Sequence, residues 1–212
     1  MLATFPAFLA FTALLVLTPG STTAVVVSHT LAGGRAAGIR AALGAALGNL
    51  TQSLVAGAGV GALLVGAPVA RRSVQVAGAG YLAYLGLRHL VAAWRGWRAH
   101  GVAAGTFEAA LQPDTGALRD GLLTNLLNPA ITTFYLVAVP TFLPTRTLRL
   151  GQDAPTYVFY TAIHVGLALL CHCGWASGLA RLRSAWSGMT ARVVLSGLSG
   201  LALLLLAVRI LR

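Results

Sequence analysis

The stretch LTPGST, Leu17 to Thr22, interrupts the first apolar segment of the chain. Proline inside a helix removes one backbone hydrogen bond and clashes with the preceding turn, so we expect Pro19 to free polar backbone groups at that depth. Such groups are tolerated within a membrane only where they face protein or a water-filled cavity. The break therefore predicts a polar site inside what is otherwise a membrane helix.

The composition identifies the class of protein. Of the 212 residues, 57% are hydrophobic and only 9% are charged, which is more apolar than one soluble core requires. Crossing a hydrocarbon layer takes roughly 20 helical residues. Six stretches are long enough, and they lie near 5–30, 42–67, 74–93, 121–143, 156–176 and 193–211. The sequence therefore predicts an all-α membrane protein with about six transmembrane helices.

The charged residues avoid the predicted spans. All 15 basic residues are arginines, and the acids fall between the spans or at their ends, at Glu108, Asp114, Asp120 and Asp153. An ionised group at the bilayer centre costs roughly 3 kcal/mol or more. The net charge of +11 is scattered over short loops, so we expect contact with anionic lipid and no nucleic acid partner. Nine arginines against six place both termini outside the cell by the positive-inside rule.

A polar connection, 96–120, divides the chain into a first half, 1–95, and a second half, 121–212, with three predicted spans each. A duplication with an odd number of spans places its second copy upside down, as in many secondary transporters. Each half begins with a broken helix, at Thr18-Pro19-Gly20 and at Asn128-Pro129. One proline can kink a helix for packing alone. Two breaks at matching places predict inverted three-helix repeats around a central site.

Polar side chains lie near both breaks. Asn49, Gln52 and Ser53 share one helix face by their spacing, and Asn125, Asn128 and Thr132 do the same. Such stripes can line a path or bond one helix to another, and amides need several partners. We therefore predict a substrate site. Its expected residues are Thr18, Pro19, Gly20, Ser21, Thr22, Asn49, Gln52, Asn125, Asn128, Pro129 and Thr132.

Two GxxxG patterns, with glycines at 44 and 48 and at 57 and 61, lie in the second predicted span. Such patterns let helices approach closely, which suits tight packing or a homodimer.

The segment CHCGW, 171–175, raises an alternative function. His164 and Cys171 are seven residues apart and fall on nearly the same side of a helix, and thiolate with imidazole suits a soft or borderline metal ion. The alternatives are a thiol-redox protein or a metal-ion efflux protein that uses Cys171, Cys173, His164 and His172. Buried cysteine is often only a small apolar filler, so we predict no resident metal and no cofactor.

Conventional catalysis finds little support. The predicted spans contain no carboxylate pair, no serine-histidine-aspartate set and no HExxH motif. We therefore do not expect an enzyme.

Three segments resemble LysE/RhtB-type amino-acid exporters. LTPGSTTAVVVSHTLAGGRAAGIRAALGAALG, 17–48, is similar to that family's TPG break, Gly-Gly-Arg turn and Gly-rich second helix. AGAGYLAYLGLRHL, 77–90, looks like its third helix, and GLLTNLLNPAITTFYLVAVPTFL, 121–143, like its Asn-Pro fourth helix. The resemblance implies a small multi-pass carrier of the bacterial inner membrane. It would export amino acids or related metabolites, driven by the proton gradient, and often as a dimer.

Two positions depart from that pattern. The family usually has Pro-Asp where Ser21 and Thr22 stand, and a lysine where Ala130 follows Pro129. If the family's two charges pair across the repeat interface, losing one would leave an uncompensated buried ion, whereas losing both leaves a neutral site. Cationic substrates then lose an obvious counter-ion.

The missing acid also leaves proton coupling without its expected group. Only histidine titrates near neutral pH without help, so His164 and His172 are the candidates for proton coupling. We therefore predict a secondary-active exporter of amino acids or related small neutral or zwitterionic metabolites. In this interpretation the unwound backbone at Pro19 and Gly20 holds the substrate, and Ser21 and Thr22 supply neutral hydrogen bonds.

Overall fold

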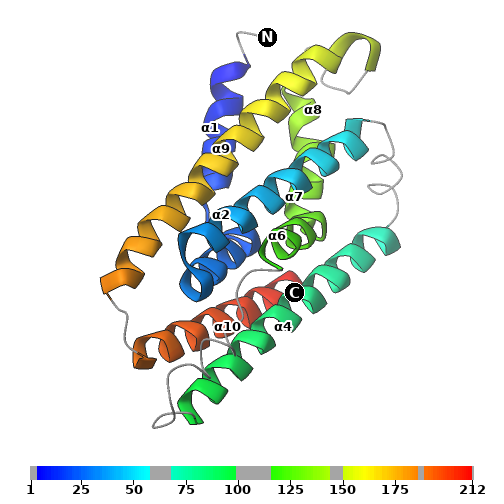
Figure 1. The fold of residues 1–212 in the computed structure, drawn as a ribbon. Helices are drawn as coiled ribbons and strands as arrows, with labels where there is room; N and C mark the ends of the chain where they lie inside the picture. Colours follow the sequence, from blue (N-terminus) through cyan, green and yellow to red (C-terminus); the bar gives the residue numbers. More distant parts are fainter. Residues whose placement is uncertain (1–3, 58–67, 99–115, 144–149, 186–188, 212) are drawn as a thin grey trace.

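A computed structural model describes residues 4–57, 68–98, 116–143, 150–185 and 189–211, and every regular element in them is a helix (Figure 1). The elements are α1 (Phe5–Leu17), α2 (Ser21–Gly57), α4 (Pro68–Arg98), α6 (Ala117–Leu126), α7 (Pro129–Thr133), the π-helical turn η1 (Phe134–Ala138), α8 (Val139–Thr141), α9 (Leu150–Ala185) and α10 (Met189–Leu211). The prediction of an all-α membrane protein is confirmed.

Among the described residues, two helical segments are each long and apolar enough to cross a membrane by themselves. They are Asp153–Arg181, within α9, and Val193–Leu211, within α10. Two bent pairs meet the same requirement together: α1 with α2, bent by 47°, and α6 with Pro129–Thr141, bent by 53°. The described residues thus hold two spans, or four if each bent pair is one span. The predicted number of about six also includes a span at 42–67, which begins in the later part of α2, and a span at 74–93, within α4. These two spans stay predictions.

Both predicted helix breaks are present. Helix α1 ends at Leu17 and α2 begins at Ser21, while α6 ends at Leu126 and α7 begins at Pro129. The Thr18 hydroxyl donates to the Leu14 carbonyl, 2.7 Å away, and so closes the end of α1. The Asn128 side chain accepts a hydrogen bond from the Ala130 N–H at 3.0 Å and caps α7, as asparagine commonly does at a helix start.

Helix α2 turns sharply at Gly34, whose backbone has φ 82° and ψ −171°. Only glycine adopts a positive φ without steric cost, so the Gly-Gly-Arg segment fits this turn. After the turn Gly38 packs against Thr30 of the preceding leg. We call residues 21–33 the first leg of α2 and residues 35–57 the second leg.

The second leg of α2 packs backbone to backbone against α6. A methyl group on Gly44 would collide with the Leu118 carbonyl, and one on Gly121 would collide with the Ala41 carbonyl. Gly48 likewise makes room for Asn125. The glycines at 44 and 48 therefore serve packing inside the chain, whereas Gly61 lies outside the described residues. The homodimer stays a prediction.

Helices α4 and α10 form a second tightly packed pair, which lies along one side of the molecule (Figure 1). A Cβ on Gly86 would lie 2.8 Å from the Gly200 carbonyl oxygen, and a Cβ on Gly200 would lie 2.7 Å from that of Gly86. An apolar cluster around Leu82, Leu203 and Val25 joins this pair to α2. We call these two helices the α4–α10 pair.

A second apolar cluster joins α1 to α9 and to the helical turns after Pro129. Its centre is Phe8, whose ring stacks on that of Tyr160 with centroids 4.2 Å apart. A cluster of small side chains, including Ala41 and Ala176, packs α2 against α9 and α6. The broken helices are thus held between α9 and the α4–α10 pair.

The predicted polar connection, 96–120, falls mostly outside the described residues. Helix α4 continues to Arg98 and α6 begins at Ala117, so helical structure extends into both ends of the connection. The division into halves 1–95 and 121–212, and their relation as inverted repeats, stay predictions.

Candidate functional site

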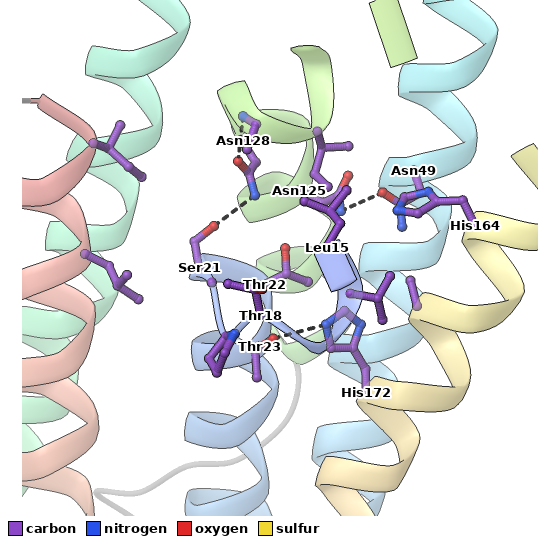
Figure 2. Close-up of a pocket in the computed structure, with 18 of the residues that line it drawn as sticks. Leu15, Thr18, Ser21, Thr22, Thr23, Asn49, Asn125, Asn128, His164 and His172 are labelled. Carbon is purple, nitrogen blue, oxygen red and sulfur yellow. Dashed lines mark hydrogen bonds between the residues drawn. The ribbon is translucent and has the colours of Figure 1, made fainter. Parts of the chain in front are cut away.

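A cavity of about 330 Å³ lies where the two helix breaks meet, and α9 and α10 complete its walls (Figure 2). Its volume is within the roughly 300–1,000 Å³ of small-molecule sites. Both histidine candidates, His164 and His172, line it from α9. Eight of the eleven predicted substrate-site residues also line it, namely Thr18, Pro19, Gly20, Ser21, Thr22, Asn49, Asn125 and Asn128.

The other three predicted residues, Gln52, Pro129 and Thr132, are not among the described residues that line the cavity. The Gln52 amide nitrogen donates to the Leu126 carbonyl at 2.8 Å and to the Thr132 hydroxyl at 2.9 Å. Pro129 is the first residue of α7. The bonds of Gln52 thus connect α2 to both sides of the second helix break without contributing to the cavity lining.

One side chain joins the two breaks directly. The Asn128 amide nitrogen donates to the Ser21 hydroxyl at 3.1 Å, as Figure 2 shows. Ser21 is also the first residue of α2. The first N–H groups of a helix have no acceptor within that helix and carry partial positive charge. The start of α2 therefore presents donors to the cavity.

Neutral pairs surround the cavity. The Asn125 amide nitrogen donates to the Asn49 side-chain oxygen at 3.0 Å (Figure 2). His164 Nδ1 lies 2.7 Å from the Tyr135 hydroxyl, and His172 Nε2 lies 3.4 Å from the Thr23 hydroxyl. All of these side chains are buried. Each imidazole is paired with an uncharged hydroxyl group of the protein.

Two buried polar atoms beside the cavity have no hydrogen-bond partner among the described residues: the Thr22 hydroxyl oxygen and the Asn125 side-chain oxygen. An unsatisfied buried polar group costs about 1–3 kcal/mol. A ligand that bonds these atoms would recover that free energy. Such a ligand has to reach them, since each atom is itself buried.

The two departures from the family pattern meet in this cavity, because Thr22 and Ala130 both line it. Among the described lining residues Arg209 alone is permanently charged, and none is an acid. Arg209 and its neighbours Leu206 and Ile210 were not among the predicted site residues, because α10 lies beyond the segments that carry the resemblance. The one available signal was an arginine close to the end of an apolar span, which we assigned to lipid head groups.

The metal and redox alternatives gain no support. Within the described ranges no three histidine, cysteine or acidic side chains are grouped as metal ligands. The Cys171 thiol lies 3.7 Å from the Val16 carbonyl oxygen, and both cysteines are free thiols.

An all-helical membrane protein with a polar cavity at paired helix breaks has the form of a secondary transporter. The family model of the LysE type translocators matches residues 13–212. The chain belongs to this family of translocators, which confirms the resemblance of its motifs.

Similar proteins carry little functional information. An uncharacterized membrane protein of Pseudomonas aeruginosa is 34% identical over 122 residues, which cover 57% of this chain and 55% of that protein. One of Vibrio cholerae is 30% identical over 131 residues, which cover 61% and 60%. The chain thus matches less than two thirds of the length of these relatives. No solved structure matches it.

Proposed function

We propose that this protein is a secondary-active exporter of amino acids or related small neutral or zwitterionic metabolites across the bacterial inner membrane. The observation that carries the proposal is the meeting of both helix breaks in one small cavity, whose polar lining side chains are neutral apart from Arg209. Broken helices that meet at a central site are the usual way in which secondary transporters hold a substrate.

The substrate's carboxylate fits the start of α2. The N–H groups of its first turn and the Thr22 hydroxyl supply hydrogen bonds there, since that hydroxyl has no partner in the protein. Arg209 adds a positive charge from α10 on the same cavity.

The substrate's ammonium or amide donors fit the acceptors of the cavity. The Asn125 side-chain oxygen lacks a partner, and Leu15 and Val16, in the last turn of α1, line the cavity, where the final carbonyl groups of a helix have no donor within it. A second positive charge on the substrate would meet Arg209 and no acid among the described lining residues. We therefore assign neutral and zwitterionic compounds to the site, and not basic amino acids.

His164 and His172 remain our candidates for proton coupling at the cavity itself. Both line it, and both could bind a proton in a state of the carrier that admits water. A homodimer also remains part of the proposal.

The first test is release of metabolites from intact cells. Cells that express the protein are loaded with a mixture of amino acids and dipeptides, and the compounds released into the medium are measured against cells with an empty vector. We expect selective release of one or a few neutral amino compounds. Absence of any difference, with the protein shown to be in the membrane, would contradict the proposal.

A matched pair of threonine variants tests the site. Thr22→Val removes a cavity hydroxyl that bonds nothing in the protein, whereas Thr51→Val removes an exposed hydroxyl whose bond is to the Leu47 carbonyl of its own helix. Both threonines lie on α2. We expect slower release only for Thr22→Val, at equal amounts of protein in the membrane. Equal release by the two variants would remove Thr22 from the site.

A further inference from the structure

A second polar cluster lies outside the cavity, around the first turn of α6. The Asp120 carboxylate is fully buried, and the Tyr81 hydroxyl donates to its Oδ1 at 2.8 Å. His29 Nε2 lies 3.2 Å and an Arg88 nitrogen 3.5 Å from Oδ2. Arg119 Nε lies 3.4 Å from Oδ1. We call these five residues the Asp120 cluster.

The cluster joins the first turn of α6 to side chains of the first predicted half, 1–95. Asp120 belongs to α6, whereas His29 is on the first leg of α2, and Tyr81 and Arg88 are on α4. Arg119 is the one partner from α6 itself, and its side chain is 60% exposed. His89 on α4 is a further titratable group close enough to interact electrostatically with His29 and Asp120. The buried charge of Asp120 is thus stabilised largely by side chains of the first half.

Helix α4 links this cluster to the cavity. It packs tightly on α10 at Gly86 and Gly200, and α10 supplies Leu206, Arg209 and Ile210 to the cavity wall. If the α4–α10 pair moves away from α6, the cavity loses that wall. The same movement takes Tyr81 and Arg88 away from Asp120.

The charge state of Asp120 decides what this movement costs. A buried ion that loses its partners is strongly destabilising, whereas a neutral carboxylic acid is far less costly to leave without them. The proton adds to a carboxylate oxygen of Asp120 and comes from water. Separation of the helices is therefore easier once Asp120 is protonated.

We propose that Asp120 is a proton-operated lock between α6 and the α4–α10 pair. Ionised, it holds the α4–α10 pair against α6, and protonated, it releases the pair and opens the cavity. The proposal rests on the proposed transport function, since only a carrier must change access to its cavity. It assigns the coupling of proton and movement to an acid that the sequence-based analysis placed at the end of a span.

The test measures the movement itself. Spin labels are placed on Leu87→Cys of α4 and Leu170→Cys of α9, both exposed, in a background with Cys171→Ser and Cys173→Ser. The distance between the labels is measured in lipid nanodiscs over a range of pH. We expect a second, longer distance to gain population as the pH falls. A control pair at Leu54→Cys of α2 and Leu170→Cys, also exposed, should keep one distance because α2 and α9 pack together.

Variants of the cluster decide the role of Asp120. Asp120→Asn should hold the longer distance at every pH, and Thr51→Val, which removes an exposed hydroxyl bonded within its own helix, should keep the response of the unaltered chain. Tyr81→Phe removes one donor to the charged carboxylate, so the midpoint of the distance change should move to higher pH. Because Tyr81→Phe leaves the ion pairs intact, it tests the proposal even if Asp120→Asn does not fold.

A distance that does not respond to pH would overturn the proposal. So would an unchanged response in folded Asp120→Asn or an unchanged midpoint in Tyr81→Phe. The measurement uses no substrate, so its failure is distinguishable from failure of the metabolite-release experiment.

Discussion

The cavity at the helix breaks and the Asp120 cluster are both polar and built from side chains far apart in the sequence, yet they differ in charge and in how fully their atoms are bonded. The cavity is neutral apart from Arg209, and it leaves the Thr22 hydroxyl and the Asn125 oxygen without partners. In the Asp120 cluster both carboxylate oxygens have partners from the protein. Unbonded neutral groups leave room for a ligand, whereas a fully bonded ion stabilises one arrangement of helices.

The same difference predicts how the two regions respond to substitution. Removing the buried carboxylate or one of its less exposed partners, Tyr81 or His29, breaks a hydrogen bond to a charged group, so we expect the cluster to be sensitive to these changes. Removing a cavity group that bonds nothing in the protein breaks no hydrogen bond of the ligand-free fold, so the free energy of unfolding should change little.

The largest expected effect on stability is that of Asp120→Ala. It leaves the Tyr81 hydroxyl and the His29 imidazole without their charged partner, and each lost hydrogen bond to a charged group costs about 1.5–3 kcal/mol. The side chains of Arg88 and Arg119 are exposed enough for water to solvate them without the acid. Thr22→Val, the matched change in the cavity, should leave the free energy of unfolding nearly unchanged. Unfolding of the two variants in detergent micelles measures both effects. Equal losses would mean that the two regions do not differ in the way described above.

An intermediate effect is expected for Asn49→Leu. This change leaves the Asn125 amide nitrogen without its acceptor, at a cost of about 1–2 kcal/mol. The double variant Asn49→Leu, Asn125→Leu removes both partners and should recover part of that loss, because no unsatisfied amide remains. A double-mutant cycle on the free energy of unfolding separates the pair from its surroundings. Purely additive losses would show that the bond does not join α2 to α6.

The smallest effect is expected for Arg209→Gln. Its side chain is exposed, so stability should not change, but the cavity loses its permanent charge. An exposed ion pair contributes at most about 1 kcal/mol, which corresponds to about a fivefold change in affinity. We therefore expect Arg209→Gln to weaken the inhibition of efflux by added glutamate, by up to about fivefold more than the inhibition by added lysine.

Arg95→Gln is the control for Arg209→Gln, because Arg95 is an exposed arginine near the end of α4 and is not a lining residue. An equal change in both variants would assign the effect to overall charge and not to the cavity.

Local chemistry explains why the sequence predicted both breaks. Proline lacks an N–H wherever it occurs, so Pro19 and Pro129 interrupt a helix regardless of what surrounds them. The asparagine before Pro129 can cap the next helix from its own position in the chain. Eight predicted substrate-site residues line the cavity because most of them lie within a turn or two of these breaks.

Helix packing explains what could not be predicted. Gln52 and Thr132 belong to polar stripes like those of the lining residues, but they bond each other across α2 and α7. Asp120 occupies the end of a predicted span, where an acid is normally solvated, and yet it is fully buried. The spacing of polar residues along one helix does not show which other helix packs against each of its faces.

The sequence by itself thus determined the class of protein, the helical breaks and the family, since apolar composition and proline chemistry act locally. Only the tertiary structure decided that Thr22, Ala130 and Arg209 share one cavity, and that Asp120 meets His29 and Tyr81 away from it. These contacts join residues far apart in the chain, and close helix approaches at positions such as Gly44 and Gly121 bring them together.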